Sequence, residues 1–305
     1  MTALPPLRSA EALPARPTLT VAVVSRNEGS MLDVCLQHVS GADEILVLDM
    51  ESTDDTQAIA AKHGARVVPV PISPIVERVR QLGVRAASSD WLLWLDTDEV
   101  PPGALDELLG PFLTDPDHAA FWVPFLDVAF GHPVPVASSG AVKICLVRPT
   151  LAFWPPGAPA HTQPTINGSV GSLLDQISPF THNSLRSVDQ WLEKTARYAQ
   201  SGGATVGDVQ GADPLLLPKL LWRAYLGRRA WLDGTPGTAS ANLGAISDYL
   251  AHLKSWEAAG SPRVVLPTRQ SRALALASLA VQRSRPIRRA LARLALPLRG
   301  ARRPE

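Results

Sequence analysis

The sequence predicts an α/β fold, in which a mostly parallel sheet is flanked by helices and followed by a C-terminal helical extension. Three observations support this prediction. Over residues 19–100, short β-branched apolar runs alternate with segments that have helical apolar spacing. Such alternation is typical of a parallel sheet with helices on both faces. After Pro101 and Pro102 the alternation stops, and amphipathic helical segments recur over residues 215–256.

The first hundred residues contain four expected strands with helical segments between them. The strands are the apolar runs 19–24, 45–48, 66–70 and 91–95. The helical segments cover 32–39, 52–64 and 75–87. Ser52 and Asp55 have nearly the spacing of a capping box, which predicts that the second helix opens at Ser52 and that Gly64 closes it.

Glycine and proline separate the expected elements of the remaining sequence. The expected elements are a helix at 103–113, strands at 119–126 and 142–147, and a helix at 189–200. We expect the chain to divide into a flexible N-terminal segment (1–18), a main domain (19–205), a helical extension (206–260) and a basic tail rich in alanine, leucine and arginine (261–305).

The charges are distributed unevenly along the chain. Residues 261–305 carry 11 arginines and one acid, whereas residues 1–260 carry 18 basic and 27 acidic side chains. This distribution indicates an anionic partner for the tail, and residues 269–303 fit a basic amphipathic segment on an anionic membrane surface. Nucleic acid is not expected, because the tail lacks aromatic side chains that could stack on bases. A solvated tail is the simpler alternative.

The cellular location follows from cysteine usage and from hydrophobicity. Cys35 and Cys145 are too few for a disulfide framework. The N-terminal segment lacks the continuous apolar core of a signal peptide, and no stretch reaches the roughly 18 apolar residues of a membrane span. We expect a cytoplasmic protein that can lie peripherally on the inner face of the cell membrane.

Three polar clusters follow expected strands directly, at residues 25–28, 49–55 and 96–99. The carboxyl ends of parallel strands lie at one edge of a sheet, so these clusters are expected to form a single site. Asp96, Asp98 and Glu99 place three carboxylates within four residues, and these repel one another unless a cation neutralises them. Oxygen ligands of this kind suit Mg²⁺ or Mn²⁺. The alternative is a solvated acidic turn before the helix at 103–113.

Two common nucleotide-binding folds are disfavoured. A dinucleotide-binding fold has a Gly-x-Gly-x-x-Gly turn after its first strand, and residues 25–30 (SRNEGS) lack it. The chain also has no Walker A motif.

At these residues the chain resembles glycosyltransferase family 2, which has the GT-A fold. The resemblance rests on Asn27-Glu28, on the ADEILVLD run that ends at Asp49, on the STDDT run from Ser52, and on the DxD-type segment Asp96-Thr97-Asp98-Glu99. Within the family the chain is most similar to the lipopolysaccharide core β-1,4-glucosyltransferase branch. The segments that carry this finer resemblance are WLEKTARYA (191–199), WLDG (231–234) and KSWE (254–257).

The resemblance implies roles for individual residues. Asp98 would ligate a Mg²⁺ or Mn²⁺ ion that bridges the donor's two phosphates, and Asp96 would face the donor's ribose or a metal-bound water. His182 matches a histidine of the branch that could contact metal or phosphate. Arg80 would offer positive charge to the diphosphate. The nucleoside pocket would be lined by Ser25, Asn27, Glu28 and Asp49.

The catalytic base is less well defined. The branch tends to have a His-Glu pair that falls at His161, but here Thr162 and Gln163 follow. An inverting transfer needs a carboxylate or a histidine to take the acceptor's proton. The candidates are His161, which we rank first, followed by Asp127 and Glu99.

These features predict an inverting, metal-dependent glycosyltransferase that moves a sugar from a UDP- or GDP-linked donor to a saccharide or glycolipid acceptor. One alternative is a sugar nucleotidyltransferase, although the expected Gly-rich turn with a basic residue is missing. The other is a non-catalytic scaffold with a donor-binding fold at the membrane surface.

Overall fold

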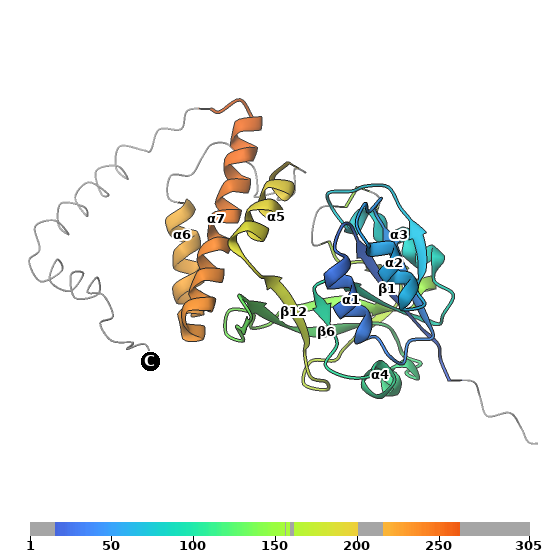
Figure 1. Ribbon diagram of the computed structural model, residues 1–305. Helices are drawn as coiled ribbons and strands as arrows, with labels where there is room; N and C mark the ends of the chain where they lie inside the picture. Colours follow the sequence, from blue (N-terminus) through green and yellow to red (C-terminus); the bar gives the residue numbers. More distant parts are fainter. Residues whose placement is uncertain (1–15, 156, 159–161, 201–215, 263–305) are drawn as a thin grey trace, which may run out of the picture.

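The computed structural model describes residues 16–155, 157–158, 162–200 and 216–262 (Figure 1). Its strands are β1 (Leu19–Ser25), β2 (Glu44–Asp49), β3 (Arg66–Pro69), β4 (Trp91–Asp96), β5 (Glu99–Val100), β6 (His118–Ala129), β7 (His132–Pro133), β8 (Val142–Val147), β9 (Ala152–Phe153), β10 (Thr165–Ile166), β11 (Ser169–Ser172) and β12 (Phe180–Leu185). Its helices are α1 (Gly29–Gln37), α2 (Thr56–Lys62), α3 (Glu77–Ala86), α4 (Leu105–Leu113), α5 (Val188–Gln200), α6 (Leu216–Trp222) and α7 (Gly234–Ala258).

One large sheet organises the described chain. Its strand order is β3-β2-β1-β4-β8-β6-β12-β5, and β11 and β7 also pair with β6. The pairs β1–β2, β1–β4 and β2–β3 are parallel, as are the pairs of β6 with β12 and β11, whereas β8 runs antiparallel to β4 and to β6. The predicted α/β fold class, a mostly parallel sheet flanked by helices with a helical C-terminal extension, is confirmed.

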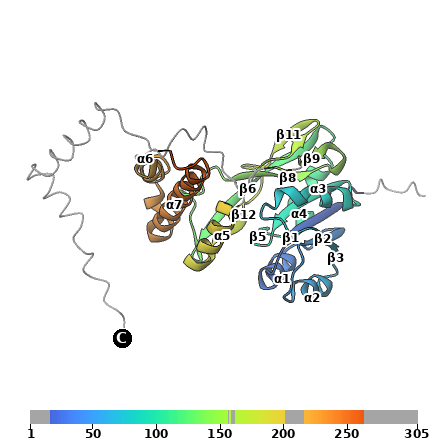
Figure 2. The ribbon, with the colours of Figure 1, turned by 90° about the horizontal axis from the view of Figure 1, so that it is seen from above.

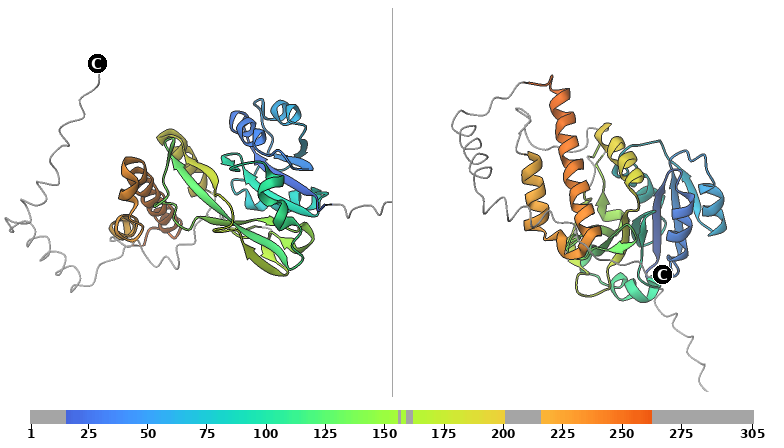
Figure 3. Two further views of the ribbon diagram at one scale, coloured as in Figure 1. Left: turned by 90° about the horizontal axis from the view of Figure 1, so that it is seen from below. Right: turned by 60° about the vertical axis from the view of Figure 1, so that its left-hand side comes forward.

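The C-terminal helices lie apart from the helices of the first half. In Figure 2, α5, α6 and α7 form one group on the left, and β6 and β12 connect it to the sheet with α1–α4. Figure 3 shows the long strand β6 crossing between the two groups. Between α6 and α7 the chain makes a π-helical turn, η2 (Arg223–Gly227), and a 3₁₀ turn, η3 (Ala230–Asp233).

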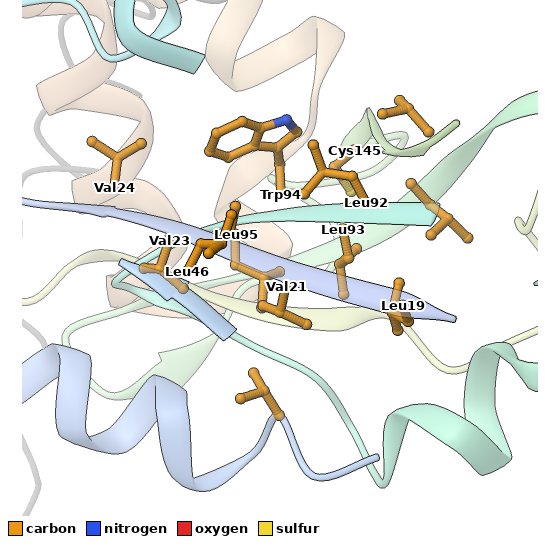
Figure 4. Close-up of a cluster of buried hydrophobic side chains, with 14 of the residues drawn as sticks. Leu19, Val21, Val23, Val24, Leu46, Leu92, Leu93, Trp94, Leu95 and Cys145 are labelled. Carbon is orange, nitrogen blue, oxygen red and sulfur yellow. The ribbon is translucent and has the colours of Figure 1, made fainter. Parts of the chain in front are cut away.

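The core is built on both faces of β1 and β4. Val24 and Trp94 project to one side of the sheet, whereas Val21 and Leu93 project to the other side (Figure 4). All residues of β1 and the first five of β4 are buried, as expected for a strand that is covered on both faces. No helix of the described residues is long and apolar enough to span a membrane.

The expected capping box at Ser52 is wrong. Helix α2 starts at Thr56, and its N-cap residue Asp55 makes no side-chain capping bond. Ser52 instead accepts a hydrogen bond from the backbone N–H of Asn27, and Asp54 accepts from the backbone N–H of Thr56. The polar residues of this loop therefore connect it to the turn after β1 before the helix begins.

Candidate active site

The carboxyl ends of three parallel strands meet at one edge of the sheet. In the sheet register, Ser25 of β1 lies opposite Asp49 of β2, and Val24 lies opposite Asp96 of β4. The convergence that the sequence predicts is confirmed.

Asp96, the last residue of β4, is held by two positively charged side chains. Its Oδ1 accepts a hydrogen bond from Arg80 Nη2 at 2.9 Å, and its Oδ2 lies 3.5 Å from Lys143 Nζ of β8. Burial opposes ionisation, but the charges of Arg80 and then Lys143 hold the pKa of Asp96 well below its usual range. Arg80 also lies over the ring of Trp94, 5.7 Å from its centroid. Asp96 is therefore ionised, and it holds the side chains of Arg80 and Lys143 at the carboxyl end of β4.

Glu99 lies behind this pair and is 1% exposed. One of its oxygens pairs with Lys143, and the other accepts a hydrogen bond from the backbone N–H of Asp96 at 3.0 Å. Because both oxygens are engaged and the side chain is enclosed, Glu99 is placed to hold Lys143 rather than to meet an acceptor hydroxyl.

Asp98 and His182 face each other across the site. His182 Nδ1 lies 2.7 Å from Asp127 Oδ1, and His182 Nε2 lies 3.7 Å from Asp98 Oδ1. An ionised carboxylate only accepts hydrogen bonds, so Nδ1 carries the proton, and in a neutral ring Nε2 presents a lone pair. Nε2 of His182 and the carboxylate of Asp98 therefore both offer ligand atoms to a cation placed between the two groups.

This donor set fits a divalent cation. Asp98, Glu99 and His182 each offer a ligand atom, and these atoms lie within 4.8 Å of one another. Since Glu99 is already engaged, Asp98 and His182 are the residues that would hold the ion. A carboxylate on the distal nitrogen of a histidine is the usual support for a metal-binding imidazole, and Asp127 provides it here. Lys194 Nζ, 3.9 Å from Asp98 Oδ2, adds a further positive charge.

Two cavities open around Asp98. The first, of about 320 Å³, is lined by Arg80, Asp96, Lys143 and His182, with residues of β1 and of the loop before α3. The second, of about 430 Å³, is shared between the turn after β1 and helix α5, with Arg186 and Lys194 in its wall. Asp98 lines both cavities. The site thus combines carboxylates for a cation with several fixed positive side chains, which suits a diphosphate.

Residues 20–136 match the model of glycosyl transferase family 2.

Several relatives share parts of the chain. Glucosyl-3-phosphoglycerate synthase of Mycolicibacterium paratuberculosis is 33% identical over 172 residues, which cover 50% of this chain and 52% of that protein. The enzyme of the same name from Mycobacterium tuberculosis is 33% identical over 118 residues, or 34% of this chain and 36% of the relative. A TPR repeat-containing protein of Synechococcus elongatus is 35% identical over 82 residues, or 27% of this chain and 20% of that protein. The chain thus spans about half or less of the length of these relatives.

Solved structures of the Mycobacterium tuberculosis synthase are also similar. The complex with Mn²⁺, uridine diphosphate and glucosyl-3-phosphoglycerate covers 63% of this chain and 82% of its own, with 20% identity and a TM-score of 0.40.

The family 2 segment contains the residues predicted to line the nucleoside pocket. Glu28 lines both cavities, and its carboxylate accepts a hydrogen bond from Thr97 Oγ1. Asn27 lines the second cavity and has a φ of 54°. Asp49 accepts hydrogen bonds from Gln57 Nε2 and from the backbone N–H of Ser52. Ser25 and Asp49 are 1% and 2% exposed, and neither lines the two cavities, so they lie beneath the site.

The other predicted residues fall in different places. His161 lies outside the described residues, so its role as the base stays a prediction. Asp127 pairs with His182 and lines a third cavity, of about 310 Å³, on the side of α6 and α7. Arg80, Asp96, Asp98 and His182 come together around the first cavity, as the resemblance implies.

Sequence reasoning missed Lys143 and assigned no role to Lys194. Lys143 lies beyond the family 2 segment, in the strand VKICLV, where it is the single charged residue of an otherwise apolar run. A lysine in such a run needs a carboxylate partner when buried, and this was the available signal. Lys194 gives no such signal, because it lies on a polar face of an amphipathic helix.

Proposed function

We propose that the protein is a glycosyltransferase that uses a nucleotide-sugar donor, linked to UDP or GDP, and depends on Mg²⁺ or Mn²⁺. The observation that carries the proposal is Asp98, at the carboxyl end of β4, facing His182 Nε2 across a cavity with Arg80 and Lys143 in its wall. The family 2 match over residues 20–136 supports the same reaction class, as do the mycobacterial relatives named for glucosyl transfer.

The proposed roles of the residues follow from their contacts. Asp98 and His182 hold the cation, and Asp127 fixes the orientation of His182. Asp96 anchors Arg80 and Lys143, so their positive charges remain next to the donor's diphosphate. Fixed positive groups favour transfer because the leaving nucleoside diphosphate gains negative charge as its bond to the sugar breaks. A bound divalent cation supplies further neutralisation of that charge.

The finer assignments form part of this proposal. The transfer is inverting, the acceptor is a saccharide or glycolipid as in the lipopolysaccharide core branch, and His161 takes the acceptor's proton. Asp127 and Glu99 are less suited to that task, because each is engaged by a neighbouring side chain on the site.

Donor hydrolysis tests the proposal most directly. UDP- and GDP-linked sugars are incubated with the protein and Mn²⁺, and the released nucleotide is measured for wild type and for Asp98→Asn. We expect cation-dependent release of UDP or GDP that falls by about 100-fold or more in the variant, because the ion loses its anionic ligand. The matched control is Asp175→Asn, which removes an exposed carboxylate away from both cavities.

Other products would identify other functions. Release of pyrophosphate from a nucleoside triphosphate and a sugar phosphate would assign the chain to the nucleotidyltransferases. Donor binding without turnover would indicate a scaffold. Release that survives Asp98→Asn unchanged would overturn the proposed role of the site.

A further inference from the structure

The turn between α6 and α7 exposes large apolar side chains. We call residues 222–232 the helical corner. Within it Trp222 is 69% exposed, Trp231 is 52% exposed and Leu232 is 52% exposed. The other six tryptophans of the chain are buried or half-buried. The corner therefore holds the two exposed tryptophans of this chain.

The exposure does not come from a loosely attached turn. Asp233 follows the corner, and its carboxylate accepts hydrogen bonds from the backbone N–H groups of Val136 and Ala137, at 3.1 and 2.7 Å. Ala230 is 1% exposed between two exposed neighbours. Gly237 of α7 packs so closely on this turn that an added Cβ would lie 2.4 Å from the carbonyl oxygen of Ala230. The fold thus holds Trp231 and Leu232 outward on a fixed support.

The charge of the corner is positive. It contains Arg223, Arg228 and Arg229 and no acidic residue. Arg223 lies 3.5 Å from Asp248 of α7. Arg228 and Arg229 are exposed, and neither forms an ion pair within the described part of the chain.

We propose that the helical corner docks on an anionic lipid bilayer. Tryptophan favours the boundary between headgroups and acyl chains, where its ring is partly buried and its N–H stays hydrated. Leucine adds apolar area, and arginines on the same turn attract anionic headgroups. Two exposed tryptophans on this corner, with two arginines that form no ion pair within the described residues, fit this boundary better than they fit water. The proposal concerns residues 222–232 alone and does not depend on the reaction at Asp98.

The corner also borders a cavity that reaches toward the site. Arg223, Arg228 and Ala230 line the third cavity together with Asp127, the partner of His182. Docking through the corner would therefore bring this cavity close to the lipid headgroups.

Vesicle co-sedimentation tests the proposal with the full chain and no donor. Vesicles of phosphatidylcholine and phosphatidylglycerol in equal parts are compared with vesicles of phosphatidylcholine alone. We expect binding to the anionic vesicles and a loss of about tenfold or more in affinity for the double variant Trp222→Ser/Trp231→Ser, which corresponds to about 1.4 kcal/mol. Arg228→Gln/Arg229→Gln should weaken binding by about fivefold for each arginine and reduce the preference for anionic lipid.

Phe153→Ser is the matched control, because Phe153 is an aromatic side chain that is 46% exposed on another part of the chain. It should bind vesicles as wild type does. Quenching of tryptophan fluorescence by brominated acyl chains provides a second measurement, and we expect it to be much weaker in the double tryptophan variant. Because the substituted residues are exposed, circular dichroism should show an unchanged fold.

Three outcomes would overturn the proposal. In the first, the wild-type protein stays in solution with anionic vesicles. In the second, the double tryptophan variant binds as well as wild type, so that another segment carries the binding. In the third, the same variant abolishes self-association of the protein without any vesicle binding, which would assign the corner to a contact between two copies.

Discussion

At the scale of single residues, the orientation of His182 depends on one hydrogen bond. Asp127 is the carboxylate on Nδ1, and the ring presents Nε2 to Asp98 because of it. If Asp127 is replaced by a group that can donate as well as accept, the ring can bind in either tautomer, and the lone pair no longer points reliably at the cation site. Asp127 therefore acts as a positioning residue.

Asp127→Asn should lower the affinity for Mn²⁺ by about 10- to 100-fold, because supporting partners of metal-binding histidines contribute to that degree. Isothermal titration with Mn²⁺ and UDP measures the effect, with Asp175→Asn as the control. Asp127→Glu should recover part of the affinity, since it restores a carboxylate. An Asn variant that binds Mn²⁺ as wild type does would exclude Asp127 from this role.

Some residues of the site could be recognised in the sequence, and others could not. Asp96 and Asp98 were recognisable because three carboxylates follow a buried strand within four positions. His182 required the family resemblance, since a lone histidine carries no periodic signal. Its partner Asp127 lies 55 positions away in the chain, and only the parallel pairing of β12 with β6 brings the two together.

At the scale of elements, the position of α3 depends on a glycine. A Cβ at Gly83 would lie 2.3 Å from the Cη2 atom of Trp94, so α3 packs directly on the indole ring. Arg80 lies one turn earlier on the same helix and reaches Asp96 from there. The distance between α3 and β4 therefore determines whether Arg80 can hold Asp96.

Gly83→Ala should destabilise the fold by about 1–3 kcal/mol, as expected for overpacking a close contact, and it should also weaken donor binding through Arg80. Urea unfolding and nucleotide titration measure the two effects. Gly244→Ala in α7 is the control: apart from its chain neighbours and the backbone of its own helix, no atom lies within 4 Å of its added Cβ, so it should be neutral or stabilising by up to about 1 kcal/mol. Equal stability of the two variants would contradict the packing argument.

Glu44, the first residue of β2, contributes a stability that depends on pH. Burial opposes its ionisation, but hydrogen bonds from Arg66, Ser88 and Thr20 lower its pKa from 4.5 to about 2. A carboxyl group whose pKa is lower in the folded chain than in the unfolded chain stabilises the fold at pH values above its unfolded-state pKa. For Glu44 this stabilisation is lost as the pH falls from about 4.5 toward 2.

Glu44→Gln should therefore be less stable than wild type at neutral pH, and the difference should shrink as the pH falls below about 4.5. Urea unfolding over a series of pH values measures the difference. The exposed Glu107→Gln should show no comparable trend. A difference that stays constant from neutral pH to pH 3 would assign the effect of Glu44 to something other than its charge.

The strands β1, β2 and β4 could be predicted from the sequence because they are buried on both faces and read as continuous apolar runs. Short strands such as β5, β9 and β10 could not, because two residues carry no detectable alternation. The start of α2 was misplaced because Ser52 has the composition of a cap, while its hydroxyl bonds a residue 25 positions away.

At the scale of the whole molecule, the helices after β12 are attached to the sheet by a few specific contacts. Trp191 of α5 donates a hydrogen bond from Nε1 to Ser247 of α7 at 2.9 Å, which joins two helices of the group. Asp233, at the end of η3, reaches the loop after β7. The sequence predicted these helices from their amphipathic spacing, but not where they attach, because the attachment uses backbone donors that any residue could provide.

Asp233→Ala should loosen the attachment of α7 while leaving the sheet intact. It removes two hydrogen bonds to a charged acceptor, which contribute about 1.5–3 kcal/mol each before the exposure of the site is considered. Hydrogen exchange should therefore become faster in the first turns of α7 and at residues 136–137, with β1 and β4 unchanged. Asp248→Ala is the control on the same helix: its carboxylate is 55% exposed and has a single 3.5 Å ion pair, so its removal should change little. Faster exchange throughout the sheet in Asp233→Ala would show that the helices and the sheet unfold as one unit. If exchange is unchanged everywhere, the support for the helical corner must come from the packing of Gly237 on Ala230 instead.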